Sequence, residues 1–443
     1  MANISNSSDG TSSGRTLSRR RMLTTLSAAG AGGIAGCTGM IGGGSKNSGT
    51  NGTIKLDYWT LFAGGDGKAM KSMVKKFNDQ HDGIQIKRQR LPWDAYYNKL
   101  YTSLTGGNAP DIAVIHATRL LKYSDYLVGL DDHLSSGAQG KYVNAMWNKS
   151  SVGDRRVTLP LDAHPVGLWY NKNIFEEAGL DPEKPPQSFS ELEDKANTIV
   201  KETDSLAFNP GPYGGASMLR SYLAFLKQRG GSLLNEKKTK ATFDSENGYA
   251  IGKFYRNLTG KWNWDKPNTA EDRGTKAFRA GDMAMVVNGT WYYGVCEEQD
   301  FDYGMAKPYV APGKKRGATW ANSHTLGVPM KKSRSKEKEK AAAKAVKWLT
   351  QHSKEWATTA GHLPASQSVL ESDDLRSSKV WNKSLSTFYE MANKGNIAYV
   401  PRTKKILEYK RPISKNINEI YGHKQKPRPA LDEAAKKVDK ILK

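Results

Sequence analysis

The sequence predicts an α/β fold with a mainly parallel sheet, and three observations support this class. β-type runs alternate with segments whose apolar residues recur at helical spacing, an order typical of parallel α/β proteins. Of the 443 residues, 37% are apolar, so the chain can build a core, and its length suggests two or three units or two large lobes. No apolar run reaches the roughly 18 residues of a membrane span, so we expect no transmembrane helix.

The elements follow one another from residue 54 onward. The run 54–59 (IKLDYW) is typical of a short strand, and 68–80 has apolar residues along one helical face. The run 111–116 (DIAVIH) is almost wholly apolar, as in a strand that is buried on both faces. Further strands are expected at 84–88, 167–170 and 283–287, and helices at 93–105, 190–202, 217–228, 336–350 and 430–442.

The basic composition does not by itself predict a nucleic-acid partner. The formal net charge is +23, from 67 Lys and Arg against 44 Asp and Glu. Residues 401–443 carry 10 Lys and 3 Arg against 5 acids, a net charge of +8. No recognisable module interleaves stacking aromatics with this charge, so we expect no nucleic-acid binding.

The amino terminus has the features of an export and lipidation signal. Arg19 and Arg20 precede a short Ala/Gly-rich run, which resembles a Tat signal, although a chance arginine run is the alternative. The sequence Ile-Ala-Gly before Cys37 resembles a lipobox, in which the cysteine thiol carries the lipid. We therefore expect a signal peptide at 1–36 and a flexible Gly/Ser/Thr/Asn tether at 37–52, with the protein anchored to the outer face of the membrane.

The chemistry-bearing residue types form no catalytic or metal-binding pattern. Cys37 and Cys296 are the two cysteines, which excludes a disulfide framework and a cysteine-based zinc site. The eight histidines are scattered without ligand spacing, and no Walker loop occurs. We therefore expect no cofactor and no metal, and we expect Cys296 to be a free thiol without structural importance.

Aromatic and polar side chains gather at the ends of the predicted strands. Ligands of open α/β sheets bind outside the carboxyl ends of strands. An aromatic face beside hydrogen-bonding groups suits a sugar, although core packing is the alternative for each aromatic. Gly289 is expected to provide the freedom for a sharp turn before Trp291. The strand-end residues are Trp59, Phe62, His116, Arg119, Asp162, His164 and Trp291.

Four sequence blocks carry a family resemblance. They are 106–112 (GGNAPDI), 168–172 (LWYNK), 278–285 (FRAGDMAM) and 361–364 (GHLP). In this order they resemble blocks of the extracellular solute-binding proteins of ABC importers, the family-1 class that includes maltose-binding and glycerol-3-phosphate-binding proteins. The resemblance covers roughly residues 53–443 and is specific for the class rather than for the ligand.

The resemblance implies a two-lobed periplasmic-binding-protein fold, type II-like, whose hinge is crossed three times by the chain. We expect lobe 1 at 53–163 and 308–352, and lobe 2 at 164–307 and 353–443. The ligand would lie between the lobes, and a membrane permease would recognise the closed form. The protein would be a monomer without enzymatic activity.

The resemblance also implies ligand-binding positions, block by block. His116 and Arg119 match the loop after the third strand, and Trp291 matches a cleft tryptophan. The polar loop 322–324 and the segment 409–411 are carried over with less support. The expected ligand-binding residues are Trp59, Phe62, Asp66, His116, Arg119, His164, Trp291, Asn322, His324 and Tyr409.

Three functions are compatible with these features. The first is a lipoprotein that delivers a mono- or oligosaccharide to an ABC permease and its ATPase. The second is a binding protein for an anionic ligand, such as glycerol 3-phosphate or an acidic sugar, because Arg119 and the 409–411 segment could bind phosphate or carboxylate. The third is a secreted glycan-active enzyme, with Asp66 and Asp162 as its candidate acids.

Overall fold

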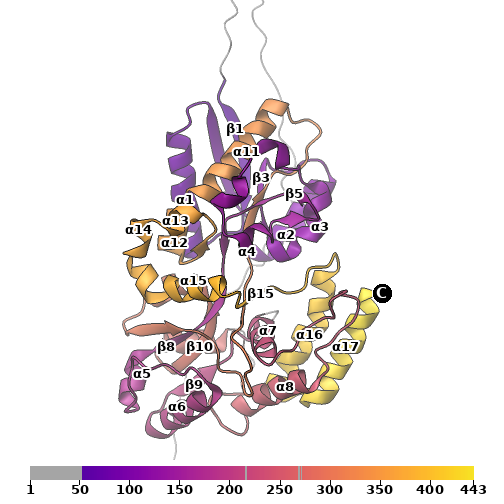
Figure 1. Ribbon diagram of the computed structural model, residues 1–443. Helices are drawn as coiled ribbons and strands as arrows, with labels where there is room; N and C mark the ends of the chain where they lie inside the picture. The colour runs from indigo at the N-terminus through magenta and orange to yellow at the C-terminus, as the bar shows by residue number, and fades with distance from the viewer. Residues whose placement is uncertain (1–51, 215–216, 268–269, 271) are drawn as a thin grey trace, which may run out of the picture. The chain divides into compact units, whose positions relative to one another are not determined.

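Two β-sheets organise the computed structural model, which describes residues 52–214, 217–267, 270 and 272–443 (Figure 1). The expected signal peptide, Cys37 and the tether up to residue 51 lie outside the described residues. None of the helices in the described ranges is long and apolar enough to cross a membrane.

The first sheet has the strand order β2-β1-β3-β13-β6. Strand β1 is parallel to β2 and β3, as the sequence predicts, whereas β13 is antiparallel to β3 and β6. Strand β13 enters this sheet after the chain has passed through the second sheet. The strands are β1 (Ile54–Thr60), β2 (Ile84–Arg90), β3 (Ile112–His116), β6 (Leu159–Pro160) and β13 (His324–Gly327).

The second sheet has the strand order β11-β8-β10-β9. Only β9 and β10 are parallel, and β8 is antiparallel to both of its neighbours, so the expectation of a mainly parallel sheet is wrong here. Strand β8 is reached from the first sheet, through a short connection rather than a helical crossover. The strands are β8 (Val166–Asn171), β9 (Leu206–Asn209), β10 (Met283–Gly289) and β11 (Tyr303–Ala306).

Six predicted helices begin and end close to their expected positions. Helix α1 buries its predicted apolar face. Ser188 caps α6 by accepting a hydrogen bond from the backbone N–H of Glu191 (3.2 Å). The helices with predicted counterparts are α1 (Gly64–Asp79), α2 (Trp93–Thr105), α6 (Phe189–Glu202), α7 (Met218–Gln228), α11 (Lys336–Gln351) and α17 (Pro427–Leu442).

Several helices have no predicted counterpart. Helix α16 contains Pro412 and lies against α17 and α8 (Figure 1). The helices without a predicted counterpart are α3 (Leu120–Tyr123), α4 (Asn144–Trp147), α5 (Lys172–Glu177), α8 (Glu246–Leu258), α9 (Arg273–Arg279), α10 (Tyr293–Cys296), α12 (Lys354–Ala360), α13 (Gln367–Leu370), α14 (Asp373–Arg376), α15 (Ser386–Asn393) and α16 (Ile406–Tyr421).

The segments that connect the two sheets pair with one another. Strand β7 pairs with β14, and β12 pairs with β15, so these connections are short two-stranded ribbons. Helix α12 packs against α1, beside the first sheet, although residues from 353 onward are expected in lobe 2. The lobe boundaries stay a prediction. The remaining short strands are β4 (Ser151–Val152), β5 (Arg155–Arg156), β7 (Asp162–Ala163), β12 (Thr319–Trp320), β14 (Leu363–Pro364) and β15 (Ile397–Ala398).

Cys296 is a free thiol, as expected, but it is not on the surface. Its side chain is 1% exposed and belongs to the hydrophobic core, where burial raises the pKa of the thiol. A packed core side chain contributes to stability, which argues against the expectation that Cys296 has no structural importance.

Candidate ligand-binding site

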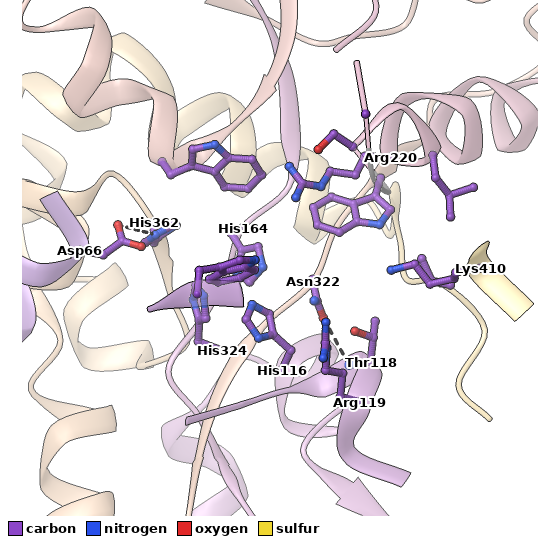
Figure 2. Close-up of a pocket in the computed structure, with 17 residues that line it drawn as sticks. Asp66, His116, Thr118, Arg119, His164, Arg220, Asn322, His324, His362 and Lys410 are labelled. Atoms are coloured by element: carbon purple, nitrogen blue, oxygen red, sulfur yellow. Dashed lines mark hydrogen bonds and ion pairs between the residues drawn. The ribbon is translucent and has the colours of Figure 1, made fainter. Parts of the chain in front are cut away.

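A cavity of about 480 Å³ lies where strand ends of both sheets meet (Figure 2). His116 ends β3, His324 begins β13 and Trp291 follows β10, so strands of both sheets position its walls. A volume of this size suits a small ligand. The residues that line it are Asp66, Trp93, His116, Thr118, Arg119, His164, Gly214, Ser217, Leu219, Arg220, Trp291, Trp320, Asn322, His324, His362, Val400 and Lys410.

Seven of the ten expected ligand-binding residues line this cavity. They come from loops and strand ends that are far apart in the sequence and lie together in the fold. They are Asp66, His116, Arg119, His164, Trp291, Asn322 and His324.

The other three expected residues lie outside the lining, because each packs into a core. Trp59 is half-buried within β1 and packs against the hydrophobic core that contains Leu56 and Tyr58 of the same strand. Phe62 is buried, with its ring centroid 4.6 Å from that of Trp356. Tyr409 is buried in α16 and donates a hydrogen bond to the carbonyl of Pro401. Its neighbour Lys410 points to a different side of the helix and reaches the cavity.

Three cations line the cavity without a carboxylate partner among the described residues. The guanidinium of Arg119 lies 3.8 Å from the ring centroid of Tyr97, and that of Arg220 lies 4.8 Å from the ring centroid of Trp291. Burial, followed by the charges of Arg119 and Arg220, lowers the pKa of Lys410 to about 8. None of the three forms an ion pair with a carboxylate of the described residues, so positive charge is concentrated on this side of the cavity.

Asp66 is the one acidic residue among the described residues that line the cavity, and its carboxylate already has a hydrogen-bond partner. Asp66 Oδ1 lies 3.1 Å from Nε2 of His362, and Nδ1 of His362 lies 2.6 Å from the hydroxyl of Thr290. Burial alone would lower the pKa of His362, but the charge of Asp66 and their hydrogen bond raise it above its usual value. In Figure 2 this pair lies across the cavity from Lys410, with three other histidines between them.

Asp162 holds two of those histidines from below the cavity surface. Its Oδ1 accepts from Nδ1 of His164 (3.0 Å) and from the backbone N–H of His324 (2.8 Å). Its Oδ2 accepts from Nδ1 of His324 (2.7 Å) and from the indole N–H of Trp356 (2.7 Å). Burial by itself would raise the pKa of Asp162, but His324 and His164 hold it well below its usual range.

His116 completes a group of three histidines. The Tyr97 hydroxyl accepts from the backbone N–H of His116 (3.0 Å) and forms a second hydrogen bond with its Nδ1. One nitrogen from each of His116, His164 and His324 lies within 4.8 Å of the others. The histidines have no ligand spacing in the sequence, and no metal is expected from it, yet neighbouring strand ends bring these three together.

Trp291 packs closely over the backbone of the strand that precedes it. An added Cβ on Gly289 would lie 2.0 Å from the Trp291 ring, and Gly289 has an ordinary φ of −86°. The glycine is therefore needed for close approach of the ring, and the expectation that its conformational freedom is needed for the turn is wrong. The ring faces the cavity between Arg220 and the edge of His164.

Replacing Trp291 with alanine is expected to weaken ligand binding by about 5- to 150-fold, measured by calorimetry. The ring offers an apolar face, and its loss should cost about 1–3 kcal/mol of binding free energy. Tyr101→Ala removes a ring that is 37% exposed outside the cavity and is the matched control. Unchanged affinity combined with a large loss of folding stability would show that Trp291 is a core residue instead.

Sequence reasoning missed several lining residues. Arg220 interrupts the apolar face of the predicted helix at 217–228, and that interruption is a signal that could have identified it. His362 lies within the GHLP block and Trp320 in β12, and neither carries a local signal. Their positions depend on the pairing of distant segments, which composition does not reveal.

Comparisons with known proteins agree with this arrangement. The model of the family described as bacterial extracellular solute-binding protein matches residues 64–355. A binding protein of Brucella abortus (strain 2308) is 23% identical over 388 residues, which are 85% of this chain and 90% of the relative.

Two solved structures share the fold. The maltose-bound MalE3 of T. maritima has a TM-score of 0.77 at 20% identity, covering 88% of this chain and 100% of that one. UgpB from Mycobacterium tuberculosis, in complex with glycerophosphocholine, has a TM-score of 0.74 at 19% identity, covering 88% of this chain and 99% of that one. The fold is thus two-lobed and α/β, as the sequence resemblance implies.

Proposed function

The chain belongs to the bacterial extracellular solute-binding proteins, and on that basis we propose that it captures a small, hydroxylated anion and delivers it to an ABC permease. The ligand class is an acidic sugar or a phosphate ester of a polyol. From the sequence, a carbohydrate is the first expected ligand and an anionic ligand the second. The described cavity favours the second.

The observation that carries this proposal is the set of unpaired cations formed by Arg119, Arg220 and Lys410. Placing cations near one another away from bulk water is unfavourable unless an anion neutralises them. Burial lowers the pKa of Arg220 to about 10, although the charge of Asp272 opposes this. A carboxylate or phosphate would supply the missing negative charge, and Arg is suited to bind either in a bidentate manner.

The rest of the lining suits the uncharged part of such a ligand. Trp291 and Trp320 offer apolar ring faces, and Thr118 and Asn322 offer hydrogen-bonding groups. The glycerophosphocholine bound by the M. tuberculosis UgpB also contains a phosphate ester of glycerol, although its choline cation balances the phosphate charge. A neutral sugar is the second candidate, because the same rings and polar groups would fit it.

Matched ligand pairs test the proposal. Calorimetric titration would compare glycerol 3-phosphate with glycerol, and glucuronate with glucose, on the same protein. We expect saturable binding of at least one anion and none of its neutral partner. Binding of neutral sugars alone would contradict the anionic assignment and favour the neutral carbohydrate.

We also propose that the protein is not an enzyme. A glycan-active enzyme needs a carboxyl group that can reach the substrate. Asp162 accepts four hydrogen bonds and is fully buried, and Asp66 is paired with His362. Neither candidate acid has the environment that acid catalysis would need.

Lipidation at Cys37 and a Tat-type signal are part of the same proposal, with a monomeric protein on the outer face of the membrane. Replacing Cys37 with serine should move the protein from the membrane fraction to the soluble fraction of fractionated cells, because the lipid would be lost. Ser136→Ala, at an exposed position, is the control and should leave the distribution unchanged. Equal membrane retention of Cys37→Ser and wild type would contradict the anchor.

A further inference from the structure

The three histidines at the centre of the cavity are held by strands rather than by free loops. His116 and His324 are directly opposite each other on the antiparallel strands β3 and β13. His164 directly follows β7, and its backbone N–H donates to the carbonyl of Asn322 (2.9 Å). Their backbones therefore keep a fixed relation, which a preorganised site requires.

The hydrogen bonds of the rings leave one nitrogen of each ring available. Nδ1 of His164 and Nδ1 of His324 bond to Asp162, and Nδ1 of His116 bonds to the Tyr97 hydroxyl. In the part of the chain that the structure describes, Nε2 of these three rings has no hydrogen-bond partner. His362 differs, because both of its ring nitrogens are engaged.

From this arrangement we propose that His116, His164 and His324 form a site for one divalent transition metal ion, with Zn²⁺ as the reference ion. A carboxylate that accepts from the far nitrogen of a histidine fixes the tautomer and increases the basicity of the ligating nitrogen. Asp162 accepts a hydrogen bond in this way from Nδ1 of His164 and from Nδ1 of His324. The site goes beyond the proposed function and does not depend on which ligand the protein transports.

The spacing of the rings is compatible with a metal. Their centroids are 4.2 Å apart for His164 and His324, 4.6 Å for His116 and His324, and 5.6 Å for His116 and His164. Zn–N bonds of about 2.0–2.1 Å in a tetrahedron place ligand nitrogens about 3.4 Å apart. One nitrogen of each ring lies within 4.8 Å of the others, so the three rings would have to move closer together to reach this distance around a metal.

The chemical nature of the three ligands indicates which metal ions the site would bind. Three imidazoles select borderline ions such as Zn²⁺, Co²⁺ or Ni²⁺ over Mg²⁺ and Ca²⁺, which prefer oxygen.

Three protein ligands would leave one coordination position open. All three histidines line the cavity, so that position would be available to an oxygen of a bound anion. The charge of Asp162 beneath two of the ligands partly compensates the metal, and an anion would compensate it further.

Zinc titration of the full chain tests the site. The protein would be produced without a polyhistidine tag, with Cys37→Ser to remove the thiol outside the core, and stripped with a chelator. Competition with a chromogenic chelator then measures affinity. We expect one equivalent of Zn²⁺, weakened by more than about 100-fold in His116→Gln and in His324→Gln, since second-shell changes alone cost about 10- to 100-fold.

Three controls keep the test decisive. His352→Ala removes an exposed histidine and should bind Zn²⁺ as the parent does. Circular dichroism and thermal unfolding without metal identify any variant that fails to fold. The two glutamine variants lie on different strands, and one variant that folds is enough to test the loss of zinc affinity. If neither variant folds, the Co²⁺ complex of the parent decides: the strong visible absorption of a four-coordinate nitrogen site supports the proposal, and its absence overturns it. No Zn²⁺ binding by the parent, or equal binding by the glutamine variants, also overturns it.

Discussion

Replacing Arg220 with alanine will lower the affinity for the anionic ligand by about 30- to 5,000-fold. This range corresponds to about 2–5 kcal/mol, the cost of removing one partner from a buried, hydrogen-bonded charge pair. Arg220 lines the cavity on α7, over the ring of Trp291, and has no carboxylate partner among the described residues. Calorimetric titration with the anion selected by the matched ligand pairs measures the loss.

Two further variants and one stability measurement make this result specific. Arg220→Lys keeps the charge but not the planar fork, so an intermediate loss is expected. Arg90→Ala removes an exposed arginine of β2 and should leave binding unchanged. The free energy of unfolding of Arg220→Ala without ligand should equal or exceed that of wild type, because a half-buried cation without an ion-pair partner among the described residues is removed. Unchanged affinity of Arg220→Ala would contradict the proposal that these cations bind the ligand.

Replacing Asp162 with alanine will lower the free energy of unfolding by about 3–5 kcal/mol. The change removes the acceptor of four buried hydrogen bonds and leaves donors of His164, His324 and Trp356 without a partner. Denaturant unfolding at neutral pH measures the effect. Asp79→Ala, which breaks an exposed ion pair with Lys75, should change stability by less than about 1 kcal/mol.

The contribution of Asp162 also has a defined pH dependence. His324 and His164 hold its folded-state pKa well below its usual range, so the folded state stabilises the ionised carboxylate. This stabilisation is fully present above the unfolded-state pKa of about 3.9, and it is lost as the pH falls toward the folded-state value. A loss near 1 kcal/mol in Asp162→Ala, equal to that of a surface pair, would contradict the role of the network.

Much of the architecture could be predicted because it depends on local patterns. The helix at 93–105 begins and ends where its apolar spacing predicts, and the apolar run at 111–116 forms the centre of a sheet as β3. Helix α16 was missed because Pro412 interrupts the helical pattern. Without that helix, sequence reasoning could not tell that Tyr409 is buried while Lys410 faces the cavity.

The site was predicted less completely, because it is assembled by long-range pairing. His116 and Arg119 follow a recognisable strand, and their place at the cavity could be predicted from that strand end. The grouping of His116 with His324 depends on the register of β3 against β13, more than 200 residues apart, and no local spacing encodes it. Arg220 faces the cavity for a similar reason, since its helix packs beside β12.

The paired connections between the sheets have a mechanical consequence. Two strands joined by ladder hydrogen bonds bend less easily in their common plane than one strand does. We therefore expect the pairing of β7 with β14 and of β12 with β15 to limit the directions in which the two sheets can move relative to each other. Fewer accessible orientations mean less entropy lost when a ligand fixes one of them, so more of the contact energy remains as affinity.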